Sequence, residues 1–445
     1  MLIVKNYKKL IKNIFLIIPL VVIILVSLYF YNIYKSKYLV GTIIHKDTNY
    51  FEVITENDSI YRFNYNSDFD IGENIKIKYN KQLNDFNYIQ KINIKSINKE
   101  NIKLNYDDQA IEILQDMTLN EKVGQLLLVR VPETNKIETI NKYSIGGYIL
   151  FQRDVDNKTK DELINEIKLY QSTSNNPLLI AIDEEGGPVS RLSSNKNIVK
   201  SPFQSPQELF KNGGYEKIKQ DAIIKSNLLE ELGINVNLAP IADISTNSKS
   251  YIYERSFGKN KNETAKYIKT ILLTQNNNVS YVLKHFPGYS DNLDTHTSIS
   301  IDNRSYKTIK NNDFIPFKVG IENGANAILV SHNIVSNIDN KPSSLSRNIH
   351  NILRNELNFN GIIITDDLSM NAIKGYDTKT PYIDSILAGN NILIVSDYVS
   401  AYDEIYNAII EDKISEELIN RLVLKNIQFK INLNLYKQKR AWALF

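Results

Sequence analysis

The chain of 445 residues contains no cysteine. This absence excludes disulfides, attachment to a lipid through cysteine, thiol catalysis and zinc sites built from cysteine. It does not fix the compartment, although a chain without cysteine is safe in an oxidising one. The chain also lacks an excess of one charge, because its net charge is +3 and its lysines are interspersed with acidic residues. With no clustered basic face, the sequence gives no indication of a nucleic-acid partner.

Long hydrophobic runs are absent except at the N-terminus. Residues 14–31 carry no charge and have about the length that spans a hydrocarbon core. Four lysines precede this run and only Lys35 and Lys37 follow it closely, which predicts a cytoplasmic N-terminus. We therefore expect a cytoplasmic stub and transmembrane anchor over residues 1–35, a single-pass cell-membrane location and an extracytoplasmic catalytic domain. A cleaved signal peptide is the alternative, which the length of the run and the bulky residues at its end disfavour.

Residues 36–97 have the pattern of a small all-β module. Short stretches rich in β-branched and aromatic residues are separated by turn-forming residues such as Asn57, Asp58 and Ser59. We expect a compact barrel or curled sheet of five or so strands, followed by a polar linker over residues 98–107. The module is interpreted as a spacer, with glycan binding as the alternative.

From residue 108 onward, short apolar runs alternate with amphipathic helical stretches. Thr118, followed three residues later by Glu121, marks a helix start. Near-continuous apolar runs are typical of parallel strands buried on both faces, and their eightfold alternation with helices predicts a (β/α)8 barrel of the TIM type over residues 108–436, with a tail over 437–445. A doubly wound open sheet is the alternative, but its glycine-rich phosphate turn is missing. The eight runs are residues 125–130, 146–151, 177–183, 234–240, 281–286, 327–332, 362–367 and 391–396.

Polar side chains follow several of these runs at their C-terminal ends, where such a barrel carries its chemistry. Asp183 ends the third run, the pair Lys284 and His285 lies in the fifth, His332 ends the sixth and Asp366 ends the seventh. Packing alone does not explain so many polar residues at strand ends. The sequence therefore predicts a pocket.

Only five histidines are present, and one of them lies in a polar loop after the fifth run. This is His296, two residues after Asp294, a carboxylate that can hydrogen-bond the imidazole and raise its basicity. Such a histidine can transfer protons near neutral pH. His45 and His350 fall outside the strand-end pattern and are expected on the solvated surface. Metal catalysis is disfavoured because no strand carries a His-x-His pair, and we expect neither metal nor cofactor.

Asp366 is a carboxylate on a rigid strand end and can act as a nucleophile. Glycoside hydrolysis needs one group that protonates the leaving oxygen and a carboxylate that holds the oxocarbenium-like carbon. Asp367 has an equally plausible structural interpretation, since it could cap a helix that begins after the strand.

In the motifs around these residues the chain resembles glycoside hydrolase family 3, in its single-domain β-N-acetylglucosaminidase (β-hexosaminidase) branch. The resemblance runs from about residue 116 to 431, and it implies a retaining, exo-acting glycosidase that releases terminal β-linked N-acetylglucosamine from peptidoglycan fragments or related amino-sugar glycans. The motifs, in the order of the family, are EKVGQLLL, GGYILFQRDV, LLIAIDEEGGPVSRL, NLAPIADI, ERSFG, KHFPG, DTH and GIIITDDLSM.

The resemblance also implies roles for single residues. It makes Asp366 the nucleophile, His296 the acid and base, and Asp294 the partner of that histidine. The sugar-binding residues that it implies are Asp183, Arg191, Arg255, Lys284 and His285. For two of these, Arg255 and Lys284, an internal ion pair with Asp243, Glu185 or Glu254 is the alternative.

The chain departs from the family pattern at two places. Tyr289 and Ser290 follow KHFPG where the family usually has His-Gly, and Pro188 stands where an arginine is common. Three other functions remain open. These are a β-glucosidase-like specificity, phosphorolysis (a neutral imidazole would not repel phosphate), and a catalytically silent, membrane-tethered glycan-binding protein.

Overall fold

The computed structural model of the protein describes residues 37–63, 65, 68–79, 89–90, 94–100, 106–289, 295 and 298–442. The chain divides into two compact units. One unit comprises Met1–Glu56 and Tyr61–Lys103, and the other comprises Asn57–Ile60 and Leu104–Phe445.

The prediction of a membrane-spanning helix within the fold needs correction. Among the residues that the structure describes, no helix is both long enough and apolar enough to cross a membrane. The longest described helix, α7 (Pro206–Leu232), carries charged residues along its length and is kinked at Gly213 and Gly214. Residues 14–31, to which the span was assigned, lie outside the described residues. The cellular location of the protein stays a prediction.

The first unit is built on one six-stranded sheet with the order β5-β3-β2-β1-β4-β6. Its strands are β1 (Lys37–Lys46), β2 (Phe51–Thr55), β3 (Ile60–Phe63), β4 (Asn74–Tyr79), β5 (Ile89–Gln90) and β6 (Ile94–Lys99). Strand β1 is long enough to pair antiparallel with β2 through one part and with β4 through another. Gly41 allows this, because a Cβ there would lie only 2.4 Å from Val53 Cγ1 and 2.5 Å from Ile54 O. Apolar residues of β1 to β4 form the core of the unit.

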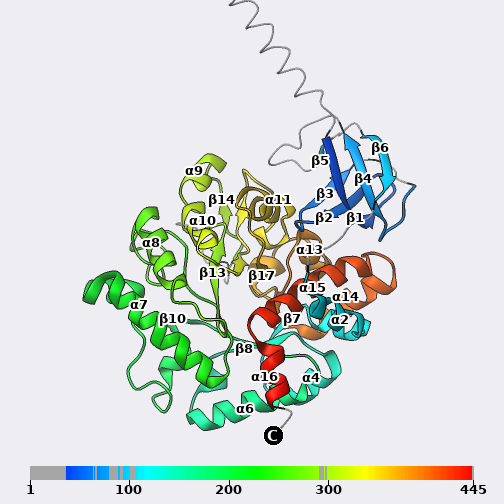
Figure 1. The fold of residues 1–445 in the computed structure, drawn as a ribbon. Helices are drawn as coiled ribbons and strands as arrows, with labels where there is room; N and C mark the ends of the chain where they lie inside the picture. The colour runs from blue at the N-terminus through cyan, green and yellow to red at the C-terminus, as the bar shows by residue number, and fades with distance from the viewer. Residues whose placement is uncertain are drawn as a thin grey trace, which may run out of the picture. The chain divides into compact units, whose positions relative to one another are not determined.

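The second unit is a nearly closed barrel of eight parallel strands (Figure 1). The strands follow one another around the sheet in chain order, and the bridge between Ile364 and Ile392 links the last two, β17 and β18. Each of the eight apolar runs of the sequence coincides with one of these strands, although β13 begins one residue before its run. They are β7 (Leu127–Arg130), β8 (Gly147–Leu150), β9 (Leu179–Ile182), β12 (Val236–Asn237), β13 (Ser280–Phe286), β15 (Ala327–Val330), β17 (Ile362–Thr365) and β18 (Leu393–Val395).

Helices connect the barrel strands and lie around them (Figure 1). Helix α3 begins at the predicted position, since the Thr118 hydroxyl accepts from the Glu121 backbone and the Glu121 carboxylate accepts from the Thr118 backbone. The described helices besides α7 are α2 (Asp108–Gln115), α3 (Leu119–Gly124), α4 (Lys136–Tyr143), α5 (Gln152–Val155), α6 (Lys160–Thr173), α8 (Lys261–Leu272), α9 (Tyr306–Asn311), α10 (Phe314–Glu322), α11 (Arg347–Asn351), α12 (Asn371–Lys374), α13 (Pro381–Ala388), α14 (Tyr398–Ile410), α15 (Glu416–Asn432) and α16 (Leu435–Trp442).

The barrel interior is apolar, and one end of it is closed by the C-terminal helices. Alternate strand residues such as Leu128, Ala181 and Ile364 form the interior cluster, together with Phe429 of α15 and Leu435 of α16. Lys430 of α15 donates to the Gln125 side chain and to the Gly146 carbonyl, which precede β7 and β8. Helix α15 therefore covers the amino ends of the strands. The carboxyl ends lie at the opposite end of the barrel, where this fold carries its functional residues.

Candidate active site

A cavity of about 370 Å³ lies at the carboxyl ends of the barrel strands. Six of the eight residues predicted for the site line it, namely Asp183, Arg191, Arg255, Lys284, His285 and Asp366. They come from positions between 183 and 366 in the sequence, and the parallel strands bring them together. The other two, Asp294 and His296, lie outside the described residues.

Asp183, directly after β9, is held by two cations. Its Oδ1 lies 2.7 Å from Lys284 Nζ, and its Oδ2 lies 3.3 Å from Arg191 Nη2. Burial opposes ionisation of Asp183, but the charges of Lys284 and Arg191 outweigh burial and hold the pKa of this carboxyl well below its ordinary value. Asp183 is therefore a fixed anion that can accept hydrogen bonds from two hydroxyls at once.

Glu185 is a second anion next to the cavity wall and joins the remaining cations. Arg255 contacts it through two bonds, Nε to Oε2 at 3.0 Å and Nη2 to Oε1 at 2.8 Å. Lys284 Nζ lies 2.7 Å from the same carboxylate, so it is shared between Asp183 and Glu185. The internal ion pair that the sequence left open is thus present, with Glu185 as the partner. It does not remove Arg255 and Lys284 from the cavity, because both still line it.

His285 is oriented by Asp243. The Nδ1 atom of His285 lies 2.8 Å from Asp243 Oδ2, and the same oxygen accepts from the His285 backbone at 3.0 Å. The other ring nitrogen, Nε2, lies 3.4 Å from Arg255 Nη2, which can only donate. These contacts assign the proton to Nδ1 and leave Nε2 as an acceptor. Asp243 therefore fixes both the tautomer and the direction of a ring that lines the cavity.

Asp366 and Asp367 differ in their surroundings although they are neighbours. Asp366 is only half-buried and lines the cavity, and its Oδ1 accepts from the Asp367 backbone at 2.9 Å. The Asp367 carboxylate accepts from the Ser369 backbone, the Ser396 backbone and the Ser396 hydroxyl. It therefore ties β17 to the loop after β18. The predicted cap is wrong in detail, because Met370 is the N-cap of α12 and has no side-chain bond there.

The loop between β13 and β14 (Ile301–Asp302) passes close to the end of β17 at Thr295. This residue separates Asp294 from His296 in the sequence, and it is fully buried. Its carbonyl accepts from the backbone of Ala372, six residues beyond Asp366, at 3.3 Å. Its hydroxyl bonds that of Tyr289, a residue that burial and the nearby Asp366 carboxylate give a pKa well above the ordinary value. The chain of this loop is therefore attached to the wall that carries Asp366.

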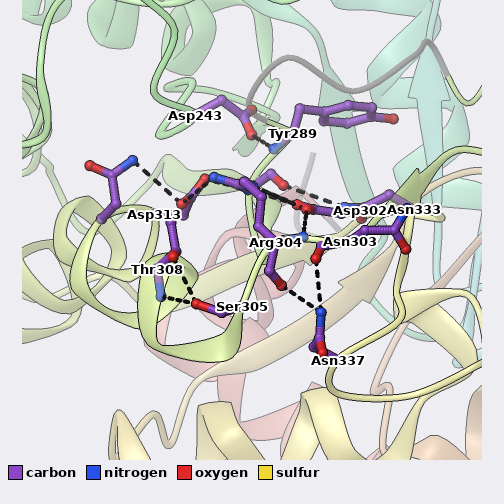
Figure 2. Close-up of polar contacts among 12 residues, drawn as sticks. Asp243, Tyr289, Asp302, Asn303, Arg304, Ser305, Thr308, Asp313, Asn333 and Asn337 are labelled. Atoms are coloured by element: carbon purple, nitrogen blue, oxygen red, sulfur yellow. Dashed lines mark hydrogen bonds and ion pairs between the residues drawn. The ribbon is translucent and has the colours of Figure 1, made fainter.

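Both ends of this loop are anchored by buried carboxylates (Figure 2). At the start, Asp243 accepts from the Tyr289 backbone at 2.7 Å. At the end, Arg304 joins Asp302 and Asp313, with four donor–acceptor distances of 2.7 to 3.0 Å. Glycine is required at 288, because φ is +117° and a Cβ would lie 2.8 Å from Asp313 Oδ1.

The family is decided by comparison with known proteins. Residues 118–427 match the family model described as the glycosyl hydrolase family 3 N terminal domain. The chain belongs to glycoside hydrolase family 3. A β-hexosaminidase from Nitrosomonas eutropha is 30% identical to it over 299 residues, which cover 64% of this chain and 84% of that protein. One from Actinobacillus pleuropneumoniae is 32% identical over 242 residues, which cover 53% and 69%.

A solved structure gives the same result. The glycoside hydrolase family 3 β-N-acetylglucosaminidase from Paenibacillus sp. str. FPU-7 has a TM-score of 0.67 and 28% identity to this chain. The match covers 72% of this chain and 63% of that chain, so it spans somewhat less than two thirds of the Paenibacillus protein. With this membership and these relatives, the protein is a glycosidase.

Two histidines of this family 3 glycosidase are placed differently from expectation. His350 was expected at the surface but is only 2% exposed; its Nδ1 lies 2.7 Å from the Ser346 carbonyl, and burial lowers its pKa to about 4. His332 is also buried and does not line the cavity. It contacts the Ser344 hydroxyl and, through Nε2 at 3.0 Å, the Asp367 carbonyl. His332 therefore supports the backbone beside Asp366.

The glycosidase cavity contains residues that the sequence did not single out. Arg130, Phe151, Tyr251 and Met370 line it as well. For Arg130 and Phe151 a signal was available, because each stands at the carboxyl end of a predicted strand. Tyr251 lies in a loop, and nothing in its local sequence indicates that it reaches the site. Met370 also lies in a loop, but it ends the motif GIIITDDLSM that contains Asp366. In the part of the chain that the structure describes, no three histidine or acidic side chains form a potential metal site.

Proposed function

We propose that the protein is a retaining, exo-acting β-N-acetylglucosaminidase that forms a covalent glycosyl intermediate on Asp366. The names of the β-hexosaminidase relatives and of the family 3 β-N-acetylglucosaminidase structure support the substrate class. The natural substrates that we infer are peptidoglycan fragments or related amino-sugar glycans.

The observation that carries the proposal is the shared wall of Asp366 and the loop after β13. Asp366 faces the same cavity as Asp183, Arg191, Lys284 and His285. Thr295 lies in sequence between Asp294 and His296, and it is hydrogen-bonded to the segment that follows Asp366. These contacts support a sugar bound with its reacting carbon next to Asp366 and its leaving group toward the loop after β13.

In the first step an oxygen of Asp366 attacks C1 of the terminal sugar, and the bond from C1 to the leaving oxygen breaks. His296 gives a proton to that oxygen, and Asp294 orients the imidazole. In the second step His296 takes a proton from water, the water oxygen bonds to C1 and the Asp366 carboxylate leaves. Each step inverts C1, so the product keeps the β configuration.

Fixed charges prepare the cavity for the sugar. Asp183, kept ionised by Lys284 and Arg191, accepts from hydroxyls of the non-reducing sugar. Arg255 and His285 are held by Glu185 and Asp243, so both groups keep one direction in the cavity that receives the hydroxyls and the acetamide. Such preorganised groups stabilise a transition state without reorganising during the reaction.

The test is the activity of Asp366→Gly on 4-nitrophenyl N-acetyl-β-glucosaminide. We expect activity to fall by at least about 10⁴-fold, as loss of a nucleophile does in other enzymes. Added azide should restore product formation and give the α-glycosyl azide, because azide then replaces the missing carboxylate from the same side. The neighbouring change Asp367→Asn is the matched control and should retain turnover. Full activity of Asp366→Gly without azide would refute the assignment.

A further inference from the structure

Among the cations that line the cavity, Arg130 differs from the rest because no described acidic residue forms an ion pair with it. Arg191 and Lys284 contact Asp183, and Arg255 contacts Glu185. Arg130, the last residue of β7, lines the same cavity. Within the part of the chain that the structure describes, its side chain forms no hydrogen bond and no ion pair, and its Nε is buried without a partner.

An aromatic ring holds this guanidinium in place. The Cζ atom of Arg130 lies 4.3 Å from the centroid of Phe151, a residue at the end of the neighbouring strand β8. Arg191 approaches the same ring, with its Cζ at 5.4 Å. The ring face attracts a cation, but it does not satisfy the five N–H donors of a guanidinium. Two guanidinium groups beside one ring therefore offer unused donors to a ligand with several negative oxygens.

The place of Arg130 in the barrel indicates which part of a substrate it would meet. Along the strand order, β7 and β13 are separated by four steps, which is half of the eight-stranded ring. The loop that contains Asp294 and His296 in sequence follows β13. In the proposed function the leaving group faces His296, so the wall with Arg130 is left for the terminal sugar itself.

We infer that Arg130 binds an oxyanion carried by the terminal sugar, a phosphate ester on its C6 hydroxyl, and that the enzyme prefers phosphorylated β-N-acetylglucosaminides. This inference rests on the proposed function. A phosphate fits better than a carboxylate because its three free oxygens can accept from more of the N–H donors that Arg130 offers. Free inorganic phosphate is the other source of the same chemistry.

The test compares 4-nitrophenyl N-acetyl-β-glucosaminide with its 6-phosphate as substrates of the full chain. We expect kcat/KM to be about 10- to 100-fold higher for the 6-phosphate, the range for hydrogen bonds to a charged group. Arg130→Gln should remove this preference while kcat/KM for the neutral substrate changes less than about threefold. Arg130→Lys keeps the charge without the planar fork and should retain part of the preference.

Arg153→Gln is the matched control for loss of positive charge. Arg153 is paired with Glu133 and does not line the cavity, so the ratio of the two kcat/KM values should stay as in the wild type. Equal losses on both substrates in Arg130→Gln would overturn the inference, because Arg130 would then bind a neutral part of the sugar.

Added inorganic phosphate separates the two sources of the oxyanion. The wild type could show no preference for the 6-phosphate substrate, while added inorganic phosphate changes the turnover of the neutral substrate in the wild type and not in Arg130→Gln. This result would overturn the inference of a sugar phosphate. If neither glycoside is turned over, the proposed function fails instead. Calorimetry then decides on Arg130: weaker binding of N-acetylglucosamine 6-phosphate, and not of N-acetylglucosamine, in Arg130→Gln supports the inference, and equal binding overturns it.

Discussion

Replacing Lys284 by Met tests the charge network that builds the site. Lys284 is 2% exposed, and its Nζ lies 2.7 Å from both Asp183 and Glu185. The substitution conserves most of the volume but leaves two buried carboxylates with fewer partners. Removing one member of a buried ion pair costs about 3–5 kcal/mol of unfolding free energy. For a barrel unit of about 340 residues, with an unfolding entropy of about 0.7 kcal/mol/K, this lowers Tm by about 4–7 °C.

The loss should depend on pH, and the sign follows from Asp183. In the wild type the pKa of Asp183 is lowered, so its stabilising contribution is complete above the unfolded pKa of about 4 and is lost only as pH falls through the lower folded pKa. In Lys284→Met, burial is opposed mainly by Arg191 and the folded pKa of Asp183 rises. Lowering the pH from 7 to 5 then protonates Asp183 in part of the variant molecules and removes the cost of its buried charge there. The difference in unfolding free energy between the variant and the wild type should therefore become smaller.

The assay is urea unfolding followed by far-UV circular dichroism at pH 7 and pH 5. Lys122→Met is the matched control, since Lys122 pairs at 2.8 Å with Glu416, which is 49% exposed, and such surface pairs contribute at most about 1 kcal/mol. Adding Glu185→Gln to Lys284→Met should recover part of the loss. A Lys284→Met protein as stable as the wild type at pH 7, or a difference that does not change with pH, would refute this reasoning.

Two further predictions concern other buried charges. Asp243→Asn should lower kcat/KM by about 10- to 100-fold, because it frees the tautomer and direction of His285. Steady-state kinetics on the aryl glycoside checks this, and a variant with unchanged kcat/KM would contradict it. Burial lowers the pKa of Lys430 to about 7, below its unfolded value of about 10.4, so the unfolded chain binds more protons and this group makes stability rise with pH between those values. Between pH 7.5 and 9 the unfolding free energy of the wild type should therefore rise by about 1–2 kcal/mol more than that of Lys430→Met, measured by urea unfolding. Equal changes in the two proteins over this range would contradict the assignment.

The barrel could be predicted from the sequence because its strands are local patterns. Each of the eight apolar runs is short, nearly uninterrupted and followed by a helical period, and each overlaps one parallel strand. The helix start at Thr118 was equally readable, since its capping partner Glu121 is three residues away. The rule that strand ends of a barrel meet at one face also predicted that Asp183, Lys284, His285 and Asp366 lie together, and all four line one cavity.

The contacts between residues far apart in the sequence, which decide the charges of the site, could not be predicted from such local patterns. Arg255 contacts Glu185 across 70 positions of sequence, and several possible partners were left open until the fold selected one. The local sequence does not distinguish His350 from a histidine on the surface, yet the packing of α11 buries its ring. The roles of Asp294 and His296 stay predictions from the family resemblance.

The sequence by itself determined the order of strands and helices, the strand-end carboxylate and the family, because these depend on residues near one another in the chain. Only the tertiary structure decided which charges neutralise each other and which cation of the cavity lining, Arg130, has no partner among the described residues. The reason is physical. An ion pair depends on the separation and burial of two groups, and neither quantity exists until the barrel has closed around them.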